Sequence, residues 1–160
     1  MNTAITETEN AENKMRYWED LVEAPIRRFG PIIFSNQLLD QLLDLFGEKH
    51  PVHTSDSFAS SIYRGGRIIP GALIHSITSG WIVQHADPMA VVGLRSVSWD
   101  FVRPLYPDSP FYFTIENVSS ELIDEKFGVL TTVRRVYDEG DHMCAIGRMN
   151  VLVLRRPSQS

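Results

Sequence analysis

The sequence predicts an α+β fold in which an antiparallel β-sheet closes around a long central helix. Residues 72–86, ALIHSITSGWIVQHA, are apolar on nearly every face, which favours a helix covered by other elements. Four extended segments rich in β-branched and aromatic residues follow in the second half of the chain. Because short turn-like segments separate them, we expect antiparallel strands.

The first half of the chain predicts a strand and two helices before the central one. RRFGPIIFS, residues 27–35, is typical of a short strand. Leucines at helical spacing then predict a helix that begins after Ser35, a favoured N-cap residue, and ends at Gly47. SDSFASSIYRGG, residues 55–66, predicts a second short helix that its glycine pair stops.

The second half predicts a sheet whose consecutive strands are neighbours. Apolar and polar residues alternate at Val129, Thr131 and Val133, as they do in a half-buried strand. The separators YPDS, SELIDE and DEGDH have turn composition, so we expect an antiparallel meander. The predicted strands occupy residues 90–105, 110–119, 126–138 and 144–156.

Composition narrows the class of protein. A chain of 160 residues with 43% apolar and 22% charged residues fits one globular domain, which we expect over residues 16–157 after a mobile, acidic tail at 1–15. Scattered basic residues and a net charge of −5 argue against a nucleic-acid surface. Cys144 is the single cysteine, so a disulfide within the chain and a cysteine-based zinc site are excluded. Without an apolar leader or membrane-length segment, we expect a soluble, cytoplasmic protein.

The segment FGEKHPVH, residues 46–53, contains several side chains that could bind a metal or transfer a proton. Glu48, His50 and His53 could bind a metal, act as an acid/base pair or form a polar loop. Pro51 disfavours the helix that would align both histidines, and no cysteine is available as a further ligand. These residues by themselves leave the acid/base and polar-loop interpretations open.

Four segments resemble the MaoC-type dehydratases, a branch of the hotdog-fold family that includes the (R)-specific enoyl-CoA hydratases. The resemblance runs from about Tyr17 to about Leu154. Each motif alone is weak, but the four occur in the family's order and spacing. They are YWEDL (17–21), GEKHPVH (47–53), GRIIPGALIHSITSG (66–80) and FVRPLYPDS (101–109).

The resemblance implies a hydratase or dehydratase that acts on an acyl thioester of coenzyme A or an acyl carrier protein. Glu48 would be the base, and His53 would position the water and relay its proton. Backbone N–H groups of Gly71 and Ala72, at the start of the central helix, would stabilise the thioester oxyanion. Ser79 matches a hydroxyl that orients the family's carboxylate, although a small residue that eases helix packing is an equal alternative.

The resemblance also implies no metal, no bound redox cofactor, and a homodimer or dimer of dimers with the active sites between protomers. Three departures from the family pattern are present. Glu48 replaces the usual Asp, His50 replaces the usual Asn in the pocket, and IIPG replaces the I-x-H-G that hydratases carry before the central helix. A thioesterase of the same fold and a catalytically silent acyl-binding protein therefore stay open as alternatives.

Overall fold

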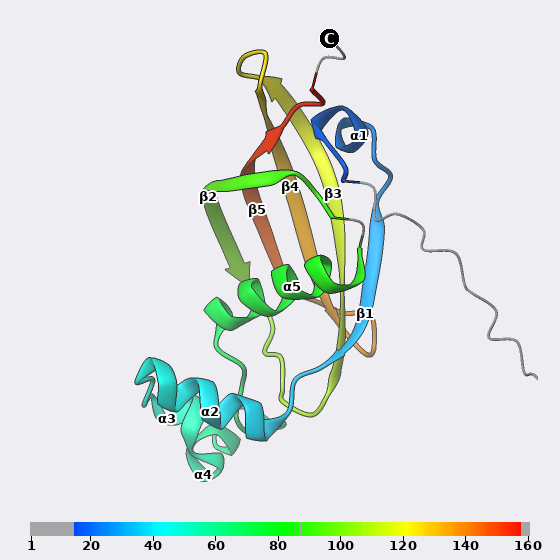
Figure 1. Ribbon diagram of the computed structural model, residues 1–160. Coiled ribbons are helices and arrows are strands. Elements are labelled where there is room, and N and C mark those ends of the chain that lie inside the picture. Colours follow the sequence, from blue (N-terminus) through cyan, green and yellow to red (C-terminus); the bar gives the residue numbers. More distant parts are fainter. Residues whose placement is uncertain (1–14, 87, 158–160) are drawn as a thin grey trace, which may run out of the picture.

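The chain forms a five-stranded antiparallel sheet with a long helix across one face, in a computed structural model that describes residues 15–86 and 88–157. In Figure 1, α5 crosses the sheet, α2, α3 and α4 gather beyond one end, and α1 lies near the other. Of the predicted tail, residues 1–14 lie outside the described part. The helices are α1 (Trp18–Val22), α2 (Asn36–Phe46), α3 (Pro51–Thr54), α4 (Asp56–Ser60) and α5 (Gly71–His85). The strands are β1 (Arg27–Ile33), β2 (Val91–Phe101), β3 (Pro110–Leu122), β4 (Phe127–Asp138) and β5 (Met143–Leu154).

The strand order is β1-β3-β4-β5-β2, which corrects the predicted meander. Strands β3, β4 and β5 are hairpin neighbours as expected, but β2 pairs with β5 at the far edge instead of with β3. The YPDS segment therefore belongs to a crossing connection. That connection is bonded along its length, because Ile69 N–H donates to the Leu105 carbonyl (2.9 Å) and Asp108 N–H donates to the Phe34 carbonyl (2.9 Å).

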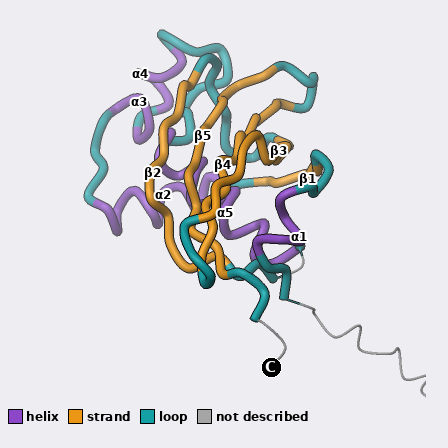
Figure 2. The backbone as a smooth tube through the Cα atoms, turned by 90° about the horizontal axis from the view of Figure 1, so that it is seen from above, coloured by secondary structure: helices purple, strands orange, loops and turns teal. Residues whose placement is uncertain are grey.

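The central helix is buried on the face that lies against the sheet. Leu73, Ile74, Thr78 and Ile82 face the sheet and are buried. The side chain of Val83, one residue further, is 78% exposed. Figure 2 shows α5 against the strands from above.

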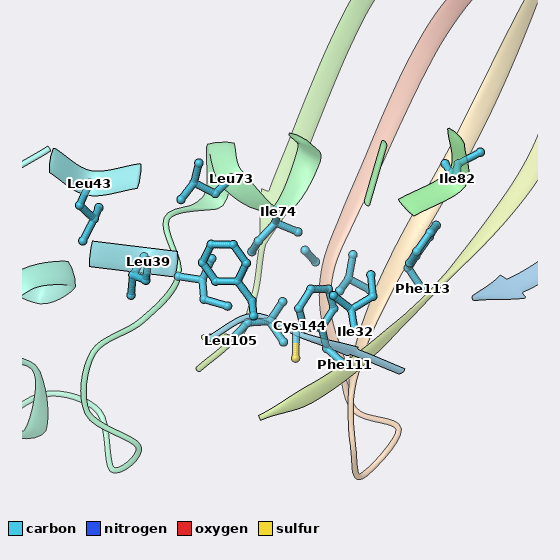
Figure 3. Packing of buried hydrophobic residues seen from close by; sticks show 14 residues of the cluster. Ile32, Leu39, Leu43, Leu73, Ile74, Ile82, Leu105, Phe111, Phe113 and Cys144 are labelled. Atoms are coloured by element: carbon cyan, nitrogen blue, oxygen red, sulfur yellow. The ribbon is translucent and has the colours of Figure 1, made fainter. Parts of the chain in front are cut away.

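The main core lies where α5, α2 and the sheet meet. Phe111 and Phe113 of β3 pack with Leu39 of α2 and Ile74 of α5, all almost fully buried (Figure 3). Cys144 sits among them on β5 as a small apolar residue, and burial raises the pKa of its thiol. This core fixes the end of α5 from which the candidate site is built.

The local signals around α2 are confirmed. Ser35 is the N-cap, and its hydroxyl accepts a hydrogen bond from Leu38 N–H (3.1 Å). Gly47 ends the helix in the left-handed conformation, with φ of 69°. The second predicted helix is shorter than expected, because α4 ends at Ser60. Within the described residues, no helix is long and apolar enough to cross a membrane.

Candidate active site

The loop between α2 and α4 arranges its polar side chains through its own backbone. Gly47 turns the chain out of α2, so that Glu48 follows directly. Glu48 Oε1 accepts a hydrogen bond from His50 N–H (2.8 Å), and its side chain is half-buried. His50 is the N-cap of α3, with Pro51 at the first helical position. The proline that disfavours a long helix therefore starts a short one.

His50 and His53 differ in which ring nitrogen carries the proton in the neutral ring. A carbonyl can only accept, so His53 Nδ1–H donates to the Ile68 carbonyl (2.8 Å), and the neutral ring leaves Nε2 with a free lone pair. His50 Nδ1 accepts from Val52 N–H (3.2 Å), so in the neutral ring Nε2 carries the proton. The ring centroids are 6.2 Å apart. The loop thus offers a proton acceptor, a proton donor and a carboxylate.

The loop is tied to the residues that precede α5. Ile68 N–H donates to the Val52 carbonyl (3.3 Å), and its own carbonyl accepts from His53. Pro70 is the N-cap of α5 and provides no side-chain cap for the helix. The first-turn N–H groups of Gly71 and Ala72 therefore lie at the positive end of the helix dipole, three residues beyond the partner of His53. Glu48, His50, His53, Gly71 and Ala72 belong to one region of the fold.

Two aromatic side chains of β2 hold the start of α5, a feature that the sequence reading did not identify. A Cβ at Gly71 would lie 2.6 Å from the Phe101 ring, so glycine is what allows this contact. Phe101 stacks on Trp99, with centroids 5.8 Å apart. Trp99 Nε1–H donates to His75 Nδ1 (3.3 Å), one turn along α5. Trp99 is thus a packing residue.

Ser79 lies on α5 away from the loop residues Glu48 and His53. It is eight residues beyond Gly71, or about 12 Å along the helix. Its hydroxyl accepts a hydrogen bond from Arg134 Nη1 (3.0 Å), and Thr78 Oγ1 accepts from the same nitrogen (2.7 Å). In the described structure the partner of Ser79 is therefore Arg134 on β4 rather than Glu48.

Arg134 reaches into a cavity of about 330 Å³ between α5, the sheet and the segment after α1. Ser79 is the one predicted site residue in its lining; the loop histidines and Glu48 do not line it. Burial lowers the pKa of Arg134 to about 10, so the guanidinium remains charged at neutral pH. Burial and the nearby Arg134 charge also lower the pKa of His75, which lines the same cavity.

The ionisable side chains of the loop make separate contacts. In residues 15–86 and 88–157, no three His, Cys, Asp or Glu side chains are close enough to share a metal ion. In the loop, Glu48 accepts from a backbone N–H, and each histidine uses Nδ1 in a backbone hydrogen bond. The arrangement suits proton transfer and hydrogen bonding.

Solved structures share this fold. A MaoC-like dehydratase from Rhodospirillum rubrum aligns with a TM-score of 0.77 at 16% identity, covering 89% of this chain and 99% of that one. An (R)-hydratase from A. caviae aligns with a TM-score of 0.64 at 20% identity, covering 83% and 95%. A Mycobacterium tuberculosis protein with a double hotdog fold aligns with a TM-score of 0.78 at 14% identity, covering 91% of this chain and 46% of that one.

No protein-family model and no curated protein sequence matches the chain. At identities of 14–20%, the likeness to solved structures establishes the fold alone. The chain therefore has a hotdog fold, which the Mycobacterium tuberculosis protein has in double form, and the predicted fold class is confirmed.

The contact between Gly71 and Phe101 generates a prediction for stability. Gly71→Ala should lower the free energy of unfolding by roughly 1–3 kcal/mol, because the new methyl group overlaps a packed ring. Gly80→Ala is the matched control on the same helix. Its Cβ meets nothing within 4 Å, so the higher helix propensity of alanine should leave the protein equally stable or more stable.

Chemical denaturation of both variants measures the difference. If Gly71→Ala were as stable as Gly80→Ala, then Phe101 would not fix the position of the helix start.

Proposed function

We propose that the protein is a hydro-lyase that adds water to, or removes it from, the 2,3 double bond of an acyl thioester. The observation that carries this proposal is the loop at the start of α5. There Glu48 and His53 are five residues apart, and His53 bonds to the Ile68 carbonyl, three residues before helix N–H groups that no side chain caps. The names of two solved structures of the same fold, a dehydratase and a hydratase, support this class of reaction.

The proposed hydration needs three groups. Glu48 accepts a proton from water as the oxygen bonds to C3 of the enoyl thioester. His53 holds the water at Nε2, takes over the proton that Glu48 has accepted and delivers it to C2, so that the hydroxyl group and this proton together add one water molecule. The N–H groups of Gly71 and Ala72 donate to the thioester oxygen, which becomes negatively charged when the C2–C3 π electrons shift. Dehydration is the same path in reverse.

The hydrogen bonds of Glu48 and His50 are compatible with the proposed hydration. The Glu48 side chain, one methylene longer than the usual Asp, folds back so that its Oε1 accepts a hydrogen bond from His50 N–H. Its Oε2 has no protein donor among the described residues and is the oxygen that would accept the proton from water. His50 is exposed, and its Nε2–H would be available as a hydrogen-bond donor to a substrate bound at the loop.

The assembly we propose is a homodimer joined through β2, alone or as part of a dimer of dimers. Strand β2 is at the edge of the sheet, so one row of its backbone groups has no neighbouring strand. Its side chains at Val91, Val92, Leu94, Val97 and Phe101 are exposed in one chain. A second copy that pairs edge to edge would satisfy the backbone groups and cover this apolar strip.

Removing the proposed acid/base groups should abolish turnover. Glu48→Gln keeps the size of the side chain but loses the proton acceptor, so kcat for hydration of crotonyl-CoA or a longer enoyl-CoA should fall by roughly 100- to 10,000-fold. His53→Ala should be comparable, and the double variant little worse, because the two groups act on one water. The rate is followed as loss of the enoyl-thioester absorbance.

His85→Ala is the control for these variants. His85 is exposed at the end of α5, stacked on Trp81, and its removal should leave kcat unchanged. Full activity in both Glu48→Gln and His53→Ala would refute the acid/base roles. Release of free thiol in place of enoyl consumption would indicate a thioesterase, and binding without turnover a silent acyl-binding protein.

The proposed dimer predicts a charge effect at the sheet edge. Light scattering at micromolar concentration should give a dimer for the natural chain and a monomer for Val97→Lys, since an inserted charge disfavours edge pairing. The control is Val118→Lys on β3, which is three positions from β2 in the sheet; the exposed fractions of the two valines are similar, 39% for Val118 and 44% for Val97. A monomeric natural chain, or a dimeric Val97→Lys variant, would contradict an interface through β2.

A further inference from the structure

Arg134 is a buried cation without an acidic partner. Its side chain is 7% exposed, and no Asp or Glu oxygen in the described residues lies within ion-pair distance of it. Hydroxyl groups of Thr78 and Ser79 accept from Nη1, but Nε is buried with no acceptor. A buried charge is strongly unfavourable unless it is paired, so the site is electrostatically incomplete.

The surroundings of Arg134 provide an aromatic contact, with its guanidinium carbon 5.8 Å from the centroid of the Phe113 ring, but no negative charge. The cavity lining contains a second arginine, Arg27, and the half-buried His75, but no aspartate or glutamate. His75 Nδ1 already accepts from Trp99, and its pKa is lowered by burial and by the nearby Arg134. The polar groups at this end of the cavity are therefore cationic or neutral.

Most of the remaining wall is apolar, although Asn117 and Thr132 also line it. Ile82 of α5, Leu130 of β4 and Met149 of β5 contribute to it, and its volume of about 330 Å³ fits a small organic group. A planar guanidinium binds a carboxylate through two parallel hydrogen bonds, and a methylene chain suits the apolar wall. Such a pocket selects a ligand that is apolar along its length and anionic at its end.

We propose that the acyl group of the substrate ends in a carboxylate, which binds Arg134 while the methylene chain lies along α5. This inference rests on the proposed function, because the thioester at the start of α5 fixes the other end of the chain. The substrate class is then a CoA or carrier-protein monothioester of a dicarboxylic acid.

The helix sets the length of that acid. Gly71 and Ser79 are about 12 Å apart along α5. Two hydrogen bonds of about 3 Å, one at each end, leave roughly 6 Å for the acyl chain. Five carbon–carbon bonds of about 1.5 Å in a zigzag cover that span, which corresponds to about six carbons.

A matched pair of substrates tests the inference. The 2-enoyl-CoA of adipic acid and hex-2-enoyl-CoA have the same chain length and differ at the last carbon, a carboxylate against a methyl group. The natural enzyme should show a kcat/KM at least about ten-fold higher for the dicarboxylic substrate, because a hydrogen-bonded charge pair typically contributes more than a tenfold change in affinity. Arg134→Met should remove or reverse this preference.

Arg135→Met is the control variant. It removes the same charge from the next residue of β4, whose side chain points to the opposite face and pairs with the half-exposed Glu116. The preference for the dicarboxylic substrate should persist in it. If the natural enzyme hydrates both substrates equally well, or Arg134→Met keeps the preference, the inference is wrong and the proposed function stands.

A binding measurement separates this inference from failure of the proposed function. Calorimetry with adipoyl-CoA and hexanoyl-CoA, which are saturated, needs no turnover. Adipoyl-CoA should bind at least about ten-fold more tightly to the natural chain but not to Arg134→Met. If neither enoyl substrate is hydrated, this difference in Kd still decides the inference; equal Kd values overturn it.

Two further probes complete the design. If Arg134→Met does not fold, Arg134→Lys keeps the charge without the two-pronged geometry and should reduce the preference part of the way. Glutaryl-CoA and suberoyl-CoA, with five and eight carbons, should bind more weakly than adipoyl-CoA if the helix sets the length. A preference that rises steadily with chain length instead would show that hydrophobic contact, not Arg134, selects the acyl group.

Discussion

The close approach of α5 to β2 is the constraint on which the rest of the molecule depends. Two glycines permit it: Gly71 lies under the Phe101 ring, and Gly147 of β5 lies under the Trp99 ring, where a Cβ would be 2.5 Å away. The stacked rings in turn set the position of His75 through its hydrogen bond with Trp99. The helix start and the first wall of the cavity are thus placed by van der Waals contact with an edge strand. Any element that packs on that strand would also affect the site.

Local features of the fold could be read from the sequence because they depend on neighbouring residues. The cap of α2 at Ser35 and its end at Gly47 are decided within a few residues of each helix end. The predicted alternation along β4 is not observed, because Val129 and Leu130 are both buried, as are Val133 and Arg134. The place of β2 in the sheet could not be read in this way. A turn composition at residues 106–109 reports that the chain bends, but it does not report which strand lies next to which. That choice is made by long-range pairing of β2 with β5.

The candidate site also combines features that the sequence predicts with features that depend on tertiary contacts. Glu48 and His53 were predicted as site residues because their spacing in the chain carries a family resemblance, whereas the tautomers of the two histidines depend on a backbone contact with Ile68 and a local cap. The burial of Arg134 was not predicted. Arg134 lies next to Arg135 in the sequence, and such a pair is typical of a solvated surface. Alternation along a strand predicts that one of the two points inward, but identical residue types give no signal of which one.

The single cysteine of the chain, Cys144, has an unreactive thiol. Cys144 has no exposed surface, and burial raises the pKa of its thiol, so both access and the thiolate fraction that reagents require are suppressed. A cysteine introduced at an exposed position of β2 or α3 would then be the one reactive sulfur in the chain. Spin labels or fluorophores could be attached there without replacing the natural residue. Distances between labels would report directly on how copies of the chain meet in solution.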